Sequence, residues 1–115
     1  MNLPSNSDQF YTNLKEKLES SDVWPNTYLY KFIYKTKDNQ LESLKAIFQE
    51  LRPEYRVIES GKGNYTSVSI TLIMESPNAV IEKYKEVGAK VTGVISLWYM
   101  NSSSIYSFLF RNLHA

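Results

Sequence analysis

Apolar residues recur at two different spacings along this chain, and these spacings predict its fold. Recurrence every three or four positions predicts amphipathic helices over residues 7–20, 39–51 and 77–87. Alternation, or a continuous β-branched and aromatic content, predicts strands over residues 27–35, 55–60, 65–74 and 91–99. After the first helix the order is strand, helix, strand, strand, helix, strand. This order predicts an α+β, ferredoxin-like βαββαβ sandwich.

The connections of such a fold determine how its sheet is arranged. Right-handed crossovers place both helices of the unit on one face of the sheet. We therefore expect a four-stranded antiparallel sheet of order 4-1-3-2, with the strands at 27–35 and 65–74 in its centre. Residues 7–99 would form one domain that includes the N-terminal helix. Residues 100–115 would form a C-terminal extension, either a short helix or disordered.

The predicted helices carry residues typical of helix ends. In chain order these are Ser5 or Ser7 as the first cap, a capping box of Asn39 with Glu42, Ser76 followed by Pro77, and Gly88 as a C-terminal stop. They set the boundaries that we expect for the helices.

The two central strands have faces of different chemistry. In residues 65–74 the apolar face is expected to be Val68, Ile70, Leu72 and Met74, and the other face starts with Tyr65, Ser67, Ser69 and Thr71. In residues 27–35 the aromatic face is Tyr28, Tyr30, Phe32 and Tyr34, whereas the wetter face is Leu29, Lys31, Ile33 and Lys35. The candidate interaction surface on the open side of the sheet is therefore Lys31, Lys62, Tyr65, Ser67, Ser69 and Thr71.

The glycine-bearing segment from Gly61 to Asn64 invites two interpretations. Backbone amides of such a turn can surround an anion, and Lys62 supplies a positive charge. A nucleotide-binding P-loop, however, has a longer spacing and leads into a helix. A strand follows here, so we interpret the segment as a hairpin turn in which the glycines permit positive φ.

Composition narrows the function without naming it. The chain has 115 residues, a net charge of +1 and no cysteine. A near-zero charge argues against nucleic acid as a partner, and the absence of cysteine fits the cytoplasm. No apolar run approaches the length of a membrane-spanning helix, and the N-terminal residues lack the pattern of a secretory signal.

The sequence contains few residues that could form a catalytic or metal-binding site. His114 is the sole histidine, close to the C-terminal end of the chain, and no pair of carboxylates has an acid–base arrangement. We therefore predict no catalytic residues, no metal and no cofactor. The aromatic set Trp24, Tyr28, Tyr30, Tyr34, Trp98 and Tyr99 is expected to pack in the core or at sheet edges, with interface anchoring as the alternative.

Three segments carry a resemblance to a known family. They are Trp24-Pro25 leading into Tyr28 to Ile33, Gly61 to Ile70, and Gly93 to Leu97. In this order and spacing they resemble the YbeD-like family of small bacterial proteins of unknown function, some of which are labelled lipoate regulatory. The resemblance covers roughly residues 10–97. It implies a ferredoxin-like fold close to ACT-type regulatory domains and implies no established catalytic residues.

The predicted fold, the family resemblance and the lack of a recognisable catalytic arrangement lead to one functional expectation with two alternatives. We expect a non-enzymatic, ACT-like regulatory or protein-interaction module that forms a homodimer or binds a protein partner. A small-ligand sensor is the first alternative, with a site near residues 35–40 or at a dimer seam, although this loop lacks the glycine common in amino-acid-sensing ACT domains. RNA binding through the open sheet face is the second, because RNA-recognition domains share this topology.

Overall fold

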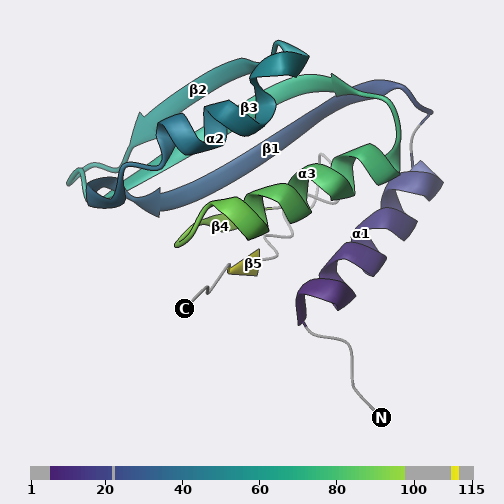
Figure 1. The fold of residues 1–115 in the computed structure, drawn as a ribbon, viewed down its shortest axis with the longest axis horizontal. Coiled ribbons are helices and arrows are strands. Elements are labelled where there is room, and N and C mark those ends of the chain that lie inside the picture. The colour runs from purple at the N-terminus through teal and green to yellow at the C-terminus, as the bar shows by residue number, and fades with distance from the viewer. Residues whose placement is uncertain (1–5, 22, 98–109, 112–115) are drawn as a thin grey trace.

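The computed structural model describes residues 6–21, 23–97 and 110–111. Figure 1 shows the α-helices beside a twisted sheet. In chain order the elements are α1 (Asn6–Ser21), β1 (Asn26–Lys35), the 3₁₀ turn η1 (Thr36–Asp38), α2 (Leu41–Phe48), the 3₁₀ turn η2 (Gln49–Leu51), β2 (Glu54–Glu59), β3 (Tyr65–Met74), α3 (Pro77–Lys90), β4 (Ile95–Leu97) and β5 (Phe110–Arg111).

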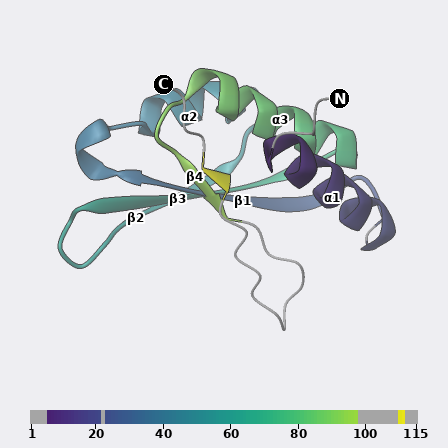
Figure 2. The same ribbon diagram turned by 90° about the horizontal axis from the view of Figure 1, so that it is seen from below.

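The sheet is antiparallel and its strands lie in the order β2-β3-β1-β4-β5. Read from β4 toward β2, the first four strands follow 4-1-3-2, and the helices lie on one side of the sheet (Figure 2). The predicted α+β class is confirmed. The sheet differs from the expected four strands because β5 pairs with β4 and adds a fifth.

The strands β1 and β3 form the centre of the fold. They pair along ten residues each, from Asn26 opposite Met74 to Lys35 opposite Tyr65. The predicted alternation of the two strands is confirmed, since the aromatic side chains Tyr30, Phe32 and Tyr34 and the apolar side chains Val68, Ile70, Leu72 and Met74 are buried. No helix among the described residues lies on the other face of the sheet.

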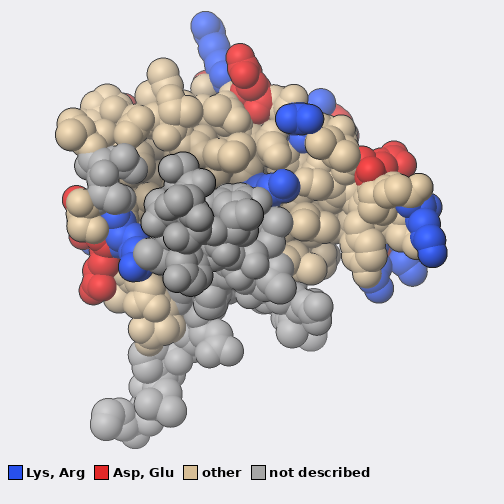
Figure 3. Space-filling model, turned by 180° about the vertical axis from the view of Figure 1, so that it is seen from behind, with Lys and Arg blue, Asp and Glu red and all other residues tan. Residues whose placement is uncertain are grey.

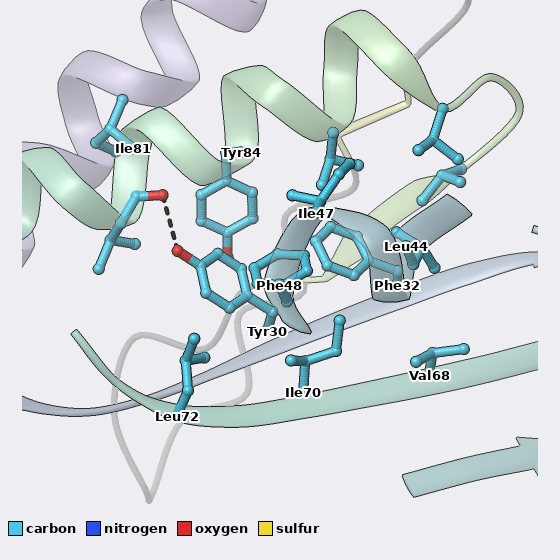
Figure 4. Packing of buried hydrophobic residues seen from close by; sticks show 14 of the residues in the cluster. Tyr30, Phe32, Leu44, Ile47, Phe48, Val68, Ile70, Leu72, Ile81 and Tyr84 are labelled. Carbon is cyan, nitrogen blue, oxygen red and sulfur yellow. Dashed lines mark hydrogen bonds between the residues drawn. The ribbon is translucent and has the colours of Figure 1, made fainter. Parts of the chain in front are cut away.

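The core lies between the sheet and the helices, as Figure 4 shows. Tyr30, Phe32, Phe48 and Tyr84 stack or meet edge to face at its centre. The Tyr30 hydroxyl donates a hydrogen bond of 2.9 Å to the carbonyl oxygen of Val80 in α3. Helix α1 joins the same core through the buried side chains of Leu14 and Leu18.

The start of the second helix differs from the prediction. Asn39 has a left-handed backbone (φ 47°) and ends η1, where its N–H donates to the carbonyl oxygen of Thr36. Gln40 then stands at the N-terminus of α2 without a side-chain cap. The predicted capping box of Asn39 with Glu42 is therefore wrong, because Asn39 is one residue too early and closes the preceding turn.

The ends of α3 are partly as expected. The Ser76 side chain accepts a hydrogen bond of 3.1 Å from the Ala79 N–H, so this cap is confirmed. The predicted stop at Gly88 is wrong, since the helix continues to Lys90 and buries Val87 and then Val91. Burial of apolar side chains on both sides of the glycine outweighs the cost of a glycine inside a helix, which is about 1 kcal/mol.

The last predicted strand begins later than residue 91. Gly93 has a positive φ of 72° and separates α3 from β4 (Ile95–Leu97), which begins at Ile95. Trp98 and Tyr99 lie outside the described residues.

The expected C-terminal extension, a short helix or a disordered segment over 100–115, is wrong at Phe110 and Arg111. These two residues form β5 and pair with Ser96 and Ile95. Antiparallel pairing satisfies backbone groups on the outer side of β4 that a helix would leave unpaired. The rest of residues 100–115, including His114, lies outside the described residues, as do Ser5 and the side chain of Ser7.

Candidate functional site

The side of the sheet opposite the helices is the surface on which the predicted interaction residues meet. Pairing places Ser69 of β3 between Lys31 of β1 and Arg56 of β2, which makes one row across three strands. A second row runs from Ile33 through Ser67 to Ile58. We call this surface the open face. Its members are Leu29, Lys31, Ile33, Lys35, Glu54, Arg56, Ile58, Tyr65, Ser67, Ser69, Thr71, Ile73 and Ile95.

The structure brings together five of the six predicted interaction residues. Tyr65, Ser67, Ser69 and Thr71 follow one another at every second position of β3, and Lys31 lies beside them. Lys62 is the exception, because it belongs to the turn that precedes β3. The β3 part of the open face is therefore a continuous row of hydroxyl groups.

Apolar side chains on the open face were missing from the predicted set. Leu29, Ile58 and Ile73 are exposed, and Ile73 keeps 69% of its surface accessible. Ile73 and Leu29 were recognisable from the alternation of their strands, whereas Ile58 required the pairing of β2 with β3. A single strand of six residues carries too short an alternation to show which of its faces is open.

The charges on this face have no acidic partner among the described residues. Ion pairs in that part of the chain join Glu86 to Lys83 and to Lys90, all on α3. Lys31 and Arg56 thus flank Ser69 as two uncompensated cations. Figure 3, seen from the open side, shows mostly tan surface with scattered blue and red side chains over the described part of the molecule.

The turn from β2 to β3 is held by its own backbone. The Gly63 N–H donates to the Ser60 carbonyl oxygen at 2.8 Å, and the Ser60 N–H donates to the Tyr65 carbonyl oxygen at 2.8 Å. Gly63 has a positive φ of 74°, whereas Gly61 does not. The interpretation as a hairpin turn is confirmed, with one glycine that requires the left-handed region. The Gly63 amide is occupied by this turn and does not point to an anion.

A pocket of about 540 Å³ lies where β1 ends against this turn. It is lined by Lys35, Thr36, Lys37, Gly63, Asn64 and Tyr65. The Thr36 N–H donates to the Asn64 carbonyl oxygen at 2.9 Å, and the hydroxyls of Thr36 and Thr66 share a hydrogen bond of 2.8 Å. These bonds join the end of β1 to the turn and to β3, and two lysines, Lys35 and Lys37, line the pocket.

The groups with shifted pKa values include tyrosines of the core and Glu86 of α3. Burial raises the pKa of Tyr28, Tyr30 and Tyr84 above the ordinary value, so all three keep their phenolic protons. Hydrogen bonding from Lys90, with a smaller contribution from Lys83, lowers the pKa of Glu86. No group of three His, Cys, Asp or Glu residues that could hold a metal ion occurs in the described part of the chain.

RNA binding by base stacking has limited support on this surface. RNA-recognition domains stack bases on aromatic side chains in the middle of the two central strands. Among the described residues of the open face, Tyr65 is the one aromatic, and it lies at the start of β3. The middle positions hold Lys31, Ser67 and Ser69.

These features define a small α+β domain with helices on one face of an antiparallel sheet and a surface of hydroxyl, apolar and charged groups on the other. The model of the family described as "Protein of unknown function (DUF493)" matches residues 21–94. The chain belongs to this family, which corresponds to the YbeD-like proteins, and the resemblance is confirmed. No curated protein and no solved structure matches the chain.

The family match covers β1 to α3 and stops one residue before β4. Nearly all of α1 lies outside it. None of the helices in the described ranges is long and apolar enough to cross a membrane.

Proposed function

We propose that this protein is a non-enzymatic, ACT-like interaction module with a regulatory role in the cytoplasm, and that it binds another protein through its open face. The observation that supports the proposal is the set of exposed apolar side chains, Leu29, Ile58, Tyr65 and Ile73, on a rigid sheet. Contiguous exposed apolar surface rimmed by polar groups is typical of protein-binding sites.

The charges of the open face indicate the chemistry of the partner. Lys31 and Arg56 lie in the central row on either side of Ser69 and form no ion pair within the described residues. A partner that covers them must supply carboxylates, because an uncompensated buried charge is costly. The partner surface is therefore expected to have acidic groups at its centre and apolar groups on either side of them.

The proposal is tested by affinity capture from the source cells with a matched pair of variants. Ile73→Lys places a charge on the open face, whereas Val23→Lys changes a residue that is 85% exposed and lies between α1 and β1. A partner that docks on the open face is captured by the wild type and by Val23→Lys and is lost with Ile73→Lys. Equal capture by both variants would contradict the open face as the docking surface, and capture of nothing by the wild type would contradict the proposed function.

The pocket at the end of β1 favours a second candidate function, the sensing of a small anionic ligand. It lies at the start of the loop for which a ligand site was predicted, and Lys35 and Lys37 both line it. A ligand present at about 100 times its dissociation constant would raise the free energy of unfolding by about 2.7 kcal/mol.

A thermal-shift screen of amino acids, nucleotides and lipoyl compounds tests this candidate. The shift should disappear in Lys37→Ala and persist in Lys62→Ala, since Lys62 belongs to the neighbouring turn but does not line the pocket. A screen without any shift would remove the support for a sensor.

A further inference from the structure

The two edges of the sheet differ in whether another described strand covers them. On one side β5 pairs with β4 and covers its edge. On the other side β2 is the last strand, and nothing in the described residues pairs with its outer side (Figure 1). An uncovered edge strand presents backbone donors and acceptors to any strand that can align with it.

The hydrogen bonds of the hairpin show which residues of β2 face outward. The Ser60 N–H bonds to the Tyr65 carbonyl oxygen, so these two residues form a hydrogen-bonded pair with β3. Alternation along an antiparallel ladder then directs the backbone groups of Tyr55, Val57 and Glu59 away from β3. Three residues thus offer six free backbone groups along one edge.

The side chains leave this edge accessible. Val57 is 44% exposed on the helix side of the sheet, and Ile58 is 48% exposed on the open face. Natural edge strands are often protected by proline or by charged side chains, lysine above all. Residues Glu54–Glu59 contain no proline or lysine, and their charged residues are Glu54, Arg56 and Glu59, of both signs.

We propose that the β2 strands of two copies of this chain pair antiparallel about a two-fold axis at Val57 and join the two sheets into one. In this register Val57 faces Val57 of the second copy, and Tyr55 faces Glu59 of the second copy. All six outward backbone groups of each copy then have partners. A shift that moves the axis to Arg56 would set Glu59 opposite Pro53, which has no N–H to donate.

Charge complementarity supports a second copy as the occupant of this edge. The Lys45 ammonium lies 5.3 Å from the centre of the Tyr55 ring, and the Tyr55 hydroxyl donates to the Lys45 carbonyl oxygen at 3.4 Å. Neither Lys45 nor Glu59 forms an ion pair within the described residues. The register brings Glu59 of one copy beside Tyr55 of the other, and so toward the free Lys45 ammonium, twice by symmetry.

The first test is the oligomeric state of two matched variants by sedimentation velocity at micromolar concentrations. Val57→Lys puts two like charges together at the two-fold axis and should give a monomer with an unchanged circular dichroism spectrum. Ile73→Lys changes an exposed apolar residue of the central strand β3, away from the edge, and should remain a dimer like the wild type. A monomeric wild type would overturn the proposal. So would a dimer that survives Val57→Lys, whether or not Ile73→Lys disrupts it by preventing face-to-face stacking.

The second test examines the register by charge reversal. Glu59→Lys and Lys45→Glu should each raise the dimer dissociation constant by about tenfold or more, because each creates two like-charge contacts. The double variant Lys45→Glu with Glu59→Lys should restore dimerisation. Two unaffected single variants, or a double variant as weak as the singles, would overturn the register.

The surface proposed here is distinct from the docking surface of the proposed function. Val57→Lys should abolish the dimer and leave the open face intact for capture of a partner. Ile73→Lys should have the opposite pair of effects, so the two proposals fail or succeed separately.

Discussion

At the scale of the single residue, the hairpin from Gly61 to Asn64 shows how local conformation separates two chemically identical positions. Gly63 has a φ of 74° and its N–H bonds to Ser60. Gly61 has no positive φ, and no atom lies within 4 Å of the position its Cβ would take. One glycine is required by the backbone and the other is not.

This difference predicts opposite effects of alanine at the two positions. Gly63→Ala should lower the free energy of unfolding by about 1 kcal/mol, because a side chain is strained in the left-handed region. Gly61→Ala should raise it by about 0.5 kcal/mol, since it restricts only the unfolded chain. Urea denaturation of both variants measures the two changes, and equal effects would contradict the assigned conformations.

At the scale of the element, helix ends depend on single hydrogen bonds. The Ser76 side chain caps α3 by accepting from the Ala79 N–H, and Pro77 follows at a position where its missing N–H costs nothing. Helix α2 starts without a side-chain cap, because Asn39 closes the preceding 3₁₀ turn. A polar residue before a predicted helix thus caps α3, as Ser76, but does not cap α2, as Asn39.

Substitutions at these two helix ends should differ accordingly. Ser76→Ala removes the cap and should lower the free energy of unfolding by about 1 kcal/mol. Glu42→Ala should change it by less than about 0.5 kcal/mol, since no capping box exists to be lost. Thermal denaturation of the two variants measures these changes. A larger loss of stability for Glu42→Ala would indicate that Glu42 does cap α2, in contradiction to the structure.

At the scale of the whole molecule, buried tyrosines connect the sheet to α3. Tyr30 donates to the Val80 carbonyl oxygen, and the hydroxyls of Tyr28 and Tyr84 share a hydrogen bond of 2.8 Å. Each of these bonds crosses from β1 to the helix through the centre of the core. Burial raises the pKa of all three phenols above the ordinary value of 10.0.

The raised pKa values predict alkaline unfolding. Below pH 10.0 both the folded and the unfolded chain hold these three protons, so these groups add no pH dependence to stability there. Above it the unfolded chain releases protons that the folded chain keeps, so the free energy of unfolding falls as the pH rises.

In an alkaline titration followed by phenolate absorbance, Tyr28, Tyr30 and Tyr84 should ionise only together with the loss of circular dichroism, because burial raises the pKa of each. The chain unfolded in urea is the control, in which the described tyrosines should titrate together. Complete ionisation before unfolding would contradict the burial of Tyr28, Tyr30 and Tyr84.

The α+β class, the two long central strands and their two faces followed from the sequence alone. Ten-residue strands such as Tyr65–Met74 repeat their alternation often enough to be read without a partner, because side-chain direction along a strand depends only on local geometry. The Ser76 cap could also be predicted, because it depends only on residues that are close together in the sequence. Five of the six candidate interaction residues could also be placed on one face in this way.

Tertiary structure decided what depends on pairing between distant segments. The pairing of β2 with β3 places Ile58 and Arg56 on the open face, and the pairing of Phe110 with Ser96 covers the edge of β4. The edge position of β2 was already expected from the order 4-1-3-2. Its register against β3 and the pairing of β5 with β4 could not be predicted from a local pattern, since they depend on the packing of the whole sheet.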